Sequence, residues 1–483
     1  MGIQSVDLVV LAPALVLAVG ALAALLTDLV VARGATAPGV VALVAVACSA
    51  ALLPPTASES TLCVQSSCGF TVTSLSLALQ GITLVATATV LLLSLVTVKD
   101  LQIPAGEHFF LLLCSAAGAV VVPATTDLVS MIVALEVVSL PTFALIALHR
   151  GDRRAGEAAL KAFLFSVAAV AVSLYGIALL YGSTGAVAFV PLFLTAAHNE
   201  PTAVAVAGLV LLLAVMAFKT AAVPFHAWAP DAYEGAPIPV AAYLSVVSKT
   251  SGFAAFALVL LTFSPWSQVW APVIAVVAAL TMLVGNVAAL RQRGAVRLLA
   301  WSSIAQGGYI LVPFGALVAG LAGSENLLEP VVAYLAAYAA MNLGAFAVVA
   351  LVAREHPRPL VEDFAGLAWR SPWLGLSLAF FLACLAGIPP GIIGLLIKVQ
   401  VIAVPVATGA WWLVAAMALA TVIGLYYYLA WAAALFRRPV ERVDTTQRPS
   451  SATAMHVAVA AMLLVSVTLS VAPALALGLF ESL

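Results

Sequence analysis

Long apolar segments, joined by short polar connections, run through nearly the whole chain of 483 residues. Hydrophobic residues make up 64% of the chain and charged residues 8%. A soluble domain carries roughly 25% charged residues, so this chain lacks the polar residues that a water-exposed surface needs. Because a hydrocarbon core about 30 Å thick takes about 20 apolar residues per helix, the chain is expected to fold as a bundle of membrane helices. The net charge of −1 argues against a nucleic-acid-binding protein.

The segmentation predicts an all-α polytopic membrane protein with about fourteen transmembrane helices. The first apolar run has no basic stretch in front of it and is long enough to cross a bilayer, so we expect a span and not a cleavable signal peptide. Hydrophilic connections are short, so residues 1–483 are expected to form a single integral membrane domain. The expected spans are residues 6–31, 38–54, 73–97, 108–123, 126–148, 158–181, 203–232, 238–263, 270–290, 296–317, 328–353, 373–406, 409–435 and 454–479.

The positions of the nineteen Lys and Arg residues orient these spans. Basic residues mark the cytoplasmic side of a membrane protein. The loops that carry them alternate with loops that carry none, so the basic loops are expected inside and both termini outside. Fifteen basic residues follow this pattern: Arg33, Lys99, Arg150, Arg153, Arg154, Arg291, Arg293, Arg297, Arg354, Arg358, Arg370, Arg437, Arg438, Arg442 and Arg448.

The five cysteines show no zinc, haem or iron–sulfur spacing, so no metal or redox cofactor is expected in this chain. Cys63 and Cys68 share an outer loop, which would face an oxidising compartment. A small disulfide and a pair of free thiols both fit this placement.

Four charged residues lie within the apolar segments, where charges are rare. Glu136 is central in the fifth span, Lys219 lies midway along the seventh, and Lys249 is central in the eighth. Lys398 lies in the outer half of the twelfth. Each such charge costs about 2.5–3.5 kcal/mol on insertion scales, and the four together cost roughly 10–14 kcal/mol. A leucine in each place would insert more easily, so these residues are predicted to carry the function.

Helix breakers coincide with two of the buried lysines. Pro224 follows Lys219 and cannot donate to the carbonyl of Thr220. Pro389 and Pro390 free two further carbonyls in the twelfth span, those of Leu385 and Ala386. Such carbonyls need protein or water partners within a membrane. Paired interrupted helices are typical of inverted-repeat transport proteins, so we predict breaks in the seventh and twelfth spans.

Two further residues allow two interpretations each. Lys161 lies near the cytoplasmic start of the sixth span, close to Glu157 and Arg154, where it fits an interfacial residue as well as a relay residue. His226 follows the first break and fits a proton shuttle as well as a structural hydrogen-bonding residue.

Buried lysines next to carboxylates support proton movement. A low-dielectric interior disfavours the charged form of a lysine, and a neighbouring carboxylate favours it, so moving the partner switches proton affinity. Glu136 and Lys219 would form such a switch if the fifth and seventh spans touch. The chain shows no phosphate-binding loop, metal cluster or nucleophile with a base, so ion movement is the chemistry that its residues permit.

Several motifs resemble those of one family. The segment KTAAVPFHAWAPDAYEGAPIPVAAYLSVVSKTSGFAAF closely resembles the N subunit of bacterial NADH:quinone oxidoreductase, respiratory complex I. LEVVSLPTFALIAL around Glu136, LLAWSSIAQGGYILV and AYLAAYAAMNLGAFAVVAL agree with it. The resemblance covers residues 105–435. The related L and M subunits and Mrp-type antiporter subunits share the PxHxWxPDA core but usually lack the YEGAP continuation.

The resemblance implies a fold and roles. It implies two inverted five-helix repeats, at residues 105–265 and 268–436, in which the seventh and twelfth helices are broken. Glu136 with Lys219 would be the paired carboxylate and lysine, Lys249 the central proton carrier and Lys398 the carrier toward the outer exit. The secondary relay candidates are His226, Lys161, Gln306 and Tyr338.

The resemblance also implies partners and a location. This chain would be a non-redox subunit of the bacterial inner membrane, in contact with the lipid bilayer and with the other membrane and peripheral subunits of complex I. NADH, flavin, iron–sulfur clusters and quinone would bind those partner subunits. Two alternatives remain open: a subunit of a Mrp-type cation/proton antiporter, and a subunit of a membrane-bound hydrogenase complex.

This chain departs from the family pattern at two positions. Lys398 stands one residue later than the usual spacing after the proline pair, and one residue turns a side chain about 100° around a helix. The sequence therefore predicts a bulge or a different helix start there. Gln306 stands where the family commonly has His, and glutamine cannot take up a proton at neutral pH. A relay at Gln306 would depend more on water.

Overall fold

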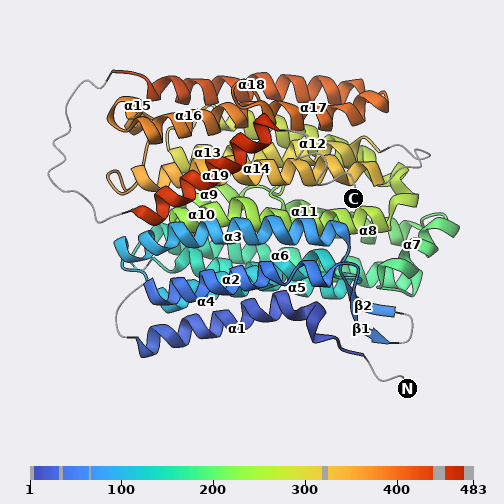
Figure 1. Cartoon of the computed structure of the whole chain (residues 1–483). Helices are drawn as coiled ribbons and strands as arrows, with labels where there is room; N and C mark the ends of the chain where they lie inside the picture. Colours follow the sequence, from blue (N-terminus) through green and yellow to red (C-terminus); the bar gives the residue numbers. More distant parts are fainter. Residues whose placement is uncertain are drawn as a thin grey trace.

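A computed structural model describes residues 5–31, 36–64, 67–149, 151–317, 325–438 and 452–472. Most of this part of the chain is helical, and the long helices lie side by side in one bundle (Figure 1). Eleven helical segments of the described residues are long and apolar enough to cross a membrane. The structure thus supports a polytopic membrane protein.

The first six long helices match the first six expected spans in order. Aspartates begin three of them: Asp7, Asp127 and Asp152 each accept a hydrogen bond from a backbone amide in the first turn. Such N-caps satisfy amides that have no partner within the helix. These helices are α1 (Leu8–Val30), α2 (Thr36–Ala51), α3 (Ser74–Asp100), α4 (Ala105–Val121), α5 (Leu128–Ala147) and α6 (Arg153–Thr184).

The expected seventh and eighth spans consist of shorter pieces. The predicted break is confirmed, because α8 (Ala203–Lys219) ends at the buried lysine and α9 (Trp228–Gly235) begins beyond Pro224. The eighth span comprises α10 (Ile238–Tyr243), a single π-helical turn η3 (Leu244–Ser248) and α11 (Lys249–Thr262). A short helix that the sequence did not predict, α7 (Phe189–His198), lies in the preceding outer loop.

The second half of the chain repeats this pattern of long helices with one break. The twelfth span is interrupted as predicted, since α16 ends at Ala386 and α17 begins at Ile392. The helices are α12 (Ser267–Ala289), α13 (Ala295–Gly315), α14 (Glu325–Val352), α15 (Leu367–Arg370), α16 (Pro372–Ala386), α17 (Ile392–Ala407), α18 (Trp411–Leu435) and α19 (Thr453–Val471). Short helical turns connect them at η1 (Pro54–Thr56), η2 (Val122–Ala124), η4 (Ser264–Trp266) and η5 (Val361–Phe364).

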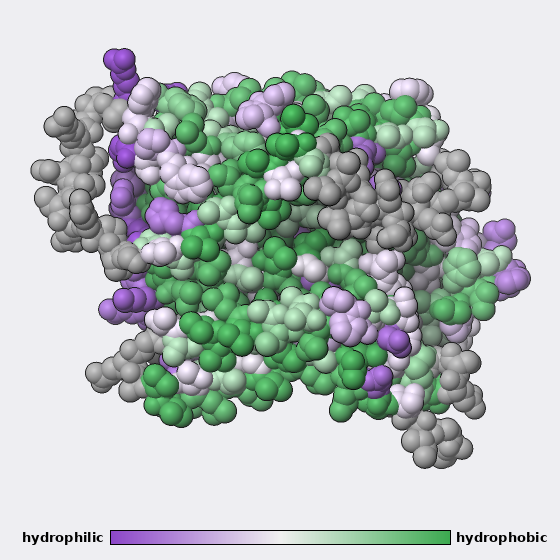
Figure 2. All heavy atoms as spheres, viewed as in Figure 1, coloured by the Kyte–Doolittle hydropathy of each residue, from purple (hydrophilic) through white to green (hydrophobic). Residues whose placement is uncertain are grey.

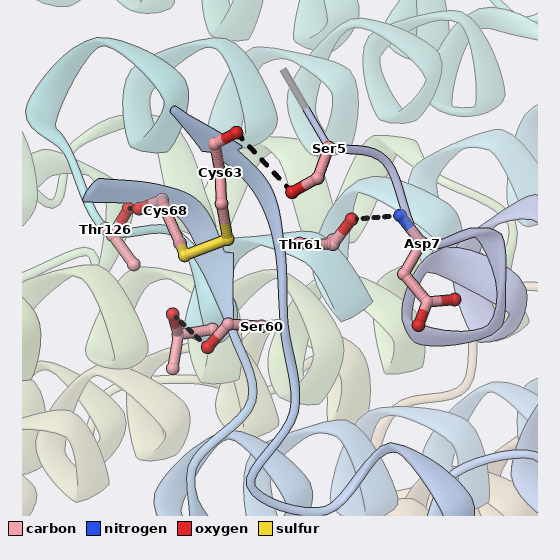
Figure 3. The surroundings of a disulfide bond; sticks show 8 residues. Ser5, Asp7, Ser60, Thr61, Cys63, Cys68 and Thr126 are labelled. Atoms are coloured by element: carbon pink, nitrogen blue, oxygen red, sulfur yellow. Dashed lines mark hydrogen bonds between the residues drawn. A yellow bond between two sulfur atoms is a disulfide. The ribbon is translucent and has the colours of Figure 1, made fainter. Parts of the chain in front are cut away.

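The loop between α2 and α3 contains a β-hairpin, so the all-α prediction is wrong there. Strands β1 (Ser60–Val64) and β2 (Ser67–Thr71) pair antiparallel, with Cys63 opposite Cys68. A disulfide joins the two cysteines (Figure 3), so the first of the two alternatives for this loop is the one observed. Thr126, just before α5, donates to the Cys68 carbonyl at 2.6 Å. The hairpin therefore ties the loop to the start of α5.

The two ends of the bundle differ in the residues they carry. The hairpin and α7 lie at the right end in Figure 1, and α15 with Arg370 lies at the left end. Hydrophobic side chains cover most of the middle of the visible face, and hydrophilic ones gather mainly at its left and right ends (Figure 2). This banding fits a membrane around the middle of the bundle. Four of the basic residues used to orient the spans lie outside the described residues: Arg33, Arg150, Arg442 and Arg448.

Candidate functional site

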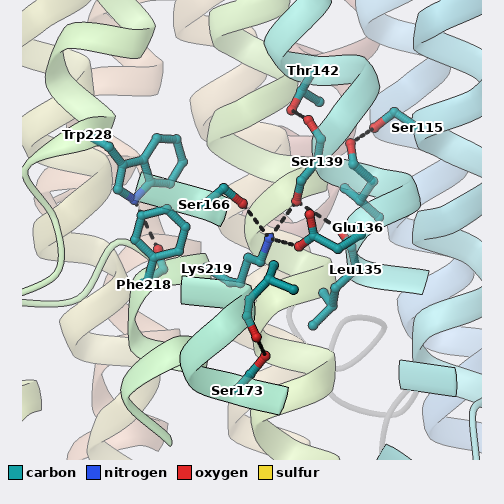
Figure 4. Close-up of polar contacts among 12 residues, drawn as sticks. Ser115, Leu135, Glu136, Ser139, Thr142, Ser166, Ser173, Phe218, Lys219 and Trp228 are labelled. Atoms are coloured by element: carbon teal, nitrogen blue, oxygen red, sulfur yellow. Dashed lines mark hydrogen bonds and ion pairs between the residues drawn. The ribbon is translucent and has the colours of Figure 1, made fainter. Parts of the chain in front are cut away.

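The predicted pair of Glu136 and Lys219 forms in the interior of the first half of the bundle. Nζ of Lys219 lies 2.6 Å from Oε1 of Glu136 and also donates to Ser139 at 2.8 Å and Ser166 at 3.2 Å (Figure 4). The side chain of Lys219 is 7% exposed and that of Glu136 is 20% exposed. The pair thus joins α5, α6 and the end of α8, which confirms that the fifth and seventh spans touch.

The break after Lys219 is built by local backbone geometry. Ala221 adopts a left-handed conformation with φ of 57°, and the amide of Ala222 donates back to the carbonyl of Ala217 at 2.7 Å. Beyond the turn, Nε1 of Trp228 donates to the Phe218 carbonyl at 3.1 Å. This contact fixes the start of α9 against the end of α8, one residue from Lys219. The break therefore holds the lysine in a set position.

Lys249 lies at the junction of η3 and α11, and its side chain is almost fully buried. Its Nζ donates to the carbonyl of Ser303 in α13. In the described part of the chain, no carboxylate pairs with this ammonium group. The hydroxyl of Tyr338, in α14, donates to Oγ of the same Ser303 at 2.7 Å. Tyr338, one of the secondary relay candidates, is thus connected to Lys249 through a single residue, Ser303.

Gln306 lies one turn after Ser303 on α13 and joins three elements. Its Nε2 donates to the carbonyl of Leu385 at 3.3 Å and to the hydroxyl of Tyr428 at 3.2 Å. Its Oε1 accepts a hydrogen bond from Tyr334. Gln306 is 3% exposed, so these hydrogen bonds are buried. They need no charged group, because a neutral amide both donates and accepts hydrogen bonds.

Lys398 points back into the break of the twelfth span. Its Nζ donates to the carbonyls of Leu385 at 3.1 Å and Ala386 at 2.8 Å, the two carbonyls that the proline pair was predicted to free. The ammonium group also lies 5.3 Å from the centre of the Tyr309 ring. α17 begins at Ile392, after the turn, and Lys398 lies six residues further along it.

These contacts connect Lys249 to Lys398 through one helix. Lys249 donates to the backbone of Ser303, and Gln306 on the next turn of α13 shares the Leu385 carbonyl with Lys398. Lys249 therefore bonds α13 directly, and Lys398 is connected to it through the Leu385 carbonyl.

Two glycines lie close to the backbone at Lys219 and Thr220, and one of them also lies close to the side chain of Lys249. A Cβ atom on Gly307 would lie 3.6 Å from both Nζ of Lys249 and the carbonyl oxygen of Thr220. A Cβ atom on Gly252 would lie 3.2 Å from the carbonyl oxygen of Lys219. The Thr220 carbonyl, which Pro224 leaves without its helical donor, thus lies close to the central lysine. Larger side chains at these glycines would separate the two groups.

Two of the secondary candidates lie away from this chain of contacts. Lys161 pairs with Glu157 at 2.7 Å and with Asp231 at 3.2 Å, and its side chain is 46% exposed. The interfacial interpretation of Lys161 is therefore the one that the structure supports. His226 packs its ring 5.4 Å from that of Trp301 in the turn before α9, and its Nδ1 is buried without a hydrogen-bond partner.

Several partners of the lysines and of Gln306 could not be identified from the sequence. Ser and Tyr residues are common in membrane helices, and nothing in their spacing distinguishes those that face a lysine. The residues found only through the structure are Ser139, Ser166, Ser303, Tyr309, Tyr334 and Tyr428. Among the described residues, no group of three or more His, Cys, Asp or Glu side chains is placed to hold a metal ion.

Known proteins share this fold and sequence. The family described as NADH:quinone oxidoreductase/Mrp antiporter, TM matches residues 125–424. NADH-quinone oxidoreductase subunit N 2 of Streptomyces griseus is 47% identical over 466 residues, which cover 94% of this chain and 87% of that protein. A similar chain in respiratory complex I from Thermus thermophilus has a TM-score of 0.79 and 30% identity, and covers 97% of this chain and 99% of its own length.

The Mrp complex from Dietzia contains a chain that shares the fold, with a TM-score of 0.82, at 20% identity over 98% of this chain and 96% of its own length. The family match spans both broken helices and Glu136, Lys219, Lys249 and Lys398. The resemblance to N subunits that the motifs indicated is thereby confirmed. This chain belongs to the family of membrane subunits of NADH:quinone oxidoreductases and Mrp antiporters.

Proposed function

We propose that this chain is a proton-translocating membrane subunit of an NADH:quinone oxidoreductase. The observation that carries the proposal is the buried ion pair of Glu136 and Lys219, 2.6 Å apart inside an apolar bundle. Removing one partner of such a pair costs about 3–5 kcal/mol. The charge on each partner therefore strongly affects how tightly the other binds its proton. The identity to relatives named subunit N supports the choice of complex.

The four buried charged residues form the relay in this proposal. Lys219, paired with Glu136, takes up a proton and passes it to Lys249 across the space lined by Gly307. Lys249 hands the proton on along α13, with Gln306 and ordered water in between, to Lys398. The direct contacts of Tyr338 with Ser303 make it a secondary relay residue.

Fourteen membrane crossings follow if each broken pair of helices counts as one span. The pairs are α8 with α9 and α16 with α17, and η3 joins α10 to α11. Residues 105–265 and 268–436 would form the two inverted repeats, each with one broken helix and one buried lysine at the break. The basic loops favour an orientation in the bacterial inner membrane in which both termini face the outside.

The chain would take no part in the redox reaction itself. NADH, flavin, iron–sulfur clusters and quinone would bind partner subunits, and electron transfer there would drive proton movement here through conformational or electrostatic coupling. The alternatives are a subunit of a Mrp-type antiporter and a subunit of a membrane-bound hydrogenase complex. The YEGAP continuation and the identity to N subunits favour the first assignment.

Purification of this chain from its native membrane with its associated subunits tests the assignment. We expect flavin- and iron–sulfur-containing subunits, and proton uptake by inverted membrane vesicles that starts when NADH is added. Co-purification with nickel-containing subunits would show a hydrogenase complex instead. Cation-dependent proton movement without any redox subunit would show an antiporter.

A further inference from the structure

Helix α3 carries a buried polar face that the relay described above does not use. Ser76, Gln80, Thr83 and Thr87 follow one another at intervals of four, three and four residues, so they lie on one side of the helix. All four are at most 2% exposed. The helix begins at the outer end of the bundle, beside the β-hairpin. The polar face therefore runs from the outer surface toward the middle of the bundle.

The outer part of this face is held by backbone carbonyls of neighbouring elements. Oγ of Ser76 donates to the Pro123 carbonyl at 2.7 Å, and Nε2 of Gln80 donates to the Val120 carbonyl at 2.8 Å. Thr73, which is exposed at the start of α3, lies 3.0 Å from Ser76 through their hydroxyl oxygens. Polar contacts therefore extend from the surface to Ser76, and Gln80 follows one turn further along the helix.

The inner part lies against the span that contains Lys249. α3 contacts both η3 and α14. Between these two elements, Nδ2 of Asn342 donates to Oγ of Ser245 at 2.7 Å, and both residues are fully buried. Ser245 precedes Lys249 by four residues, about one helical turn. Ser245 and Asn342 thus provide buried polar groups on the two elements that contact α3, and Ser245 does so one turn from the central lysine.

Three polar atoms in this region have no hydrogen-bond partner. They are Oε1 of Gln80, Oγ1 of Thr83 and Oδ1 of Asn342. Buried polar atoms in proteins are nearly always paired, and where protein groups are missing an ordered water takes their place. Two of these atoms are on α3 and the third is on α14, which contacts α3, so each indicates a place for an internal water that could carry protons between hydroxyl and amide groups.

We propose that the polar face of α3, with Ser245 and Asn342, forms a hydrated proton outlet from Lys249 to the outer surface. It would be a second outlet beside the route through Lys398 in the broken twelfth span. This outlet rests on the proposed proton-translocating function, and α3 lies outside residues 125–424 that match the family. In this structure Asn342 and Ser245 are hydrogen-bonded to each other, so a proton that passes between them requires that contact to rearrange.

The first test is a structure of the intact oxidoreductase at a resolution that shows water. We expect ordered waters within hydrogen-bonding distance of Oε1 of Gln80, Oγ1 of Thr83 and Oδ1 of Asn342. A map that shows waters around Lys219 and Lys398 but none at these three atoms would overturn the outlet. This test needs no substitution, so it does not depend on how a variant folds.

The second test uses the double variant Gln80→Leu and Thr83→Val in the assembled complex. We expect the ratio of protons pumped to electrons transferred to fall by at least half of the drop that Lys249→Met causes. Thr89→Val is the matched control, because Thr89 is equally buried on α3 but contacts Met462 of α19 on another side of the helix. The control is expected to keep the normal ratio.

The outcomes separate the outlet from the proposed function. A normal ratio in the double variant, while Lys249→Met pumps poorly, overturns the outlet and leaves the function intact. An equal fall in Thr89→Val also overturns the outlet, since it would trace the effect to the packing of α3. A normal ratio in Lys249→Met would overturn the proposed function and the outlet with it.

Discussion

Replacing Lys249 by methionine should leave a well-assembled complex that pumps fewer protons. The lysine is 3% exposed and makes one hydrogen bond, to the Ser303 carbonyl. A charge at the centre of a membrane helix costs about 2.5–3.5 kcal/mol. The lost hydrogen bond contributes about 0.5–1.5 kcal/mol. Methionine has a similar length and no charge, so the substitution should stabilise the fold by about 1–3 kcal/mol.

The assay measures NADH oxidation and proton uptake at the same time in inverted membrane vesicles. Assembly is followed by co-purification of the redox subunits. Lys99→Met serves as the control, because Lys99 is exposed near the end of α3 and its loss removes a lysine without touching the interior. We expect the control to keep the normal proton-to-electron ratio and Lys249→Met to lower it without loss of assembled complex.

Lys249→Arg distinguishes a proton carrier from a fixed charge. Arginine keeps a positive charge but does not release its proton in proteins. If Lys249 carries protons, the arginine variant should pump as poorly as the methionine variant. Normal pumping by either variant in a fully assembled complex would refute the reasoning, since neither side chain can exchange a proton.

Three further predictions follow from the contacts of the other site residues. Lys398→Leu removes a buried charge, which costs about 2.5–3.5 kcal/mol, but leaves the two carbonyls that it binds without their donor, at about 1–3 kcal/mol each, so the melting temperature should change little while the pumping ratio of the complex falls; a leucine variant that pumps better than Lys398→Ala would show that volume matters more than charge. Gln306→Leu removes the side chain that shares a carbonyl with Lys398, so it should slow pumping. Gln306→His keeps a side chain that can form hydrogen bonds and should retain most of the pumping rate. Equal pumping rates in the two variants would contradict a relay through this position. Glu136→Gln leaves the Lys219 ammonium without a counter-charge, at a cost of about 3–5 kcal/mol, so the melting temperature should fall. Adding Lys219→Met should recover most of this loss. Strictly additive effects of the two substitutions in the double variant would show that the pair is not coupled.

The sequence determined the membrane character, the order of the helices and the places where two of them break. These features depend on local properties: the length of an apolar run, the cost of a buried charge and the missing amide of a proline. For the same reason, the freed carbonyls of Leu385 and Ala386 could be named in advance. The β-hairpin around Cys63 escaped notice because a polar outer loop of this length carries no strong periodic signal.

Only the tertiary structure decided which groups meet. Glu136 and Lys219 are 83 residues apart in the chain, and Lys398 finds its two carbonyls on the far side of the break. Lys161 has the same side chain but turns to a surface carboxylate. Each outcome depends on how far a helix is rotated, and one residue changes that rotation by about 100°. When a helix is apolar on all sides, its sequence does not show which side faces which neighbour. The packing of the helices therefore decides the partners of its few polar residues.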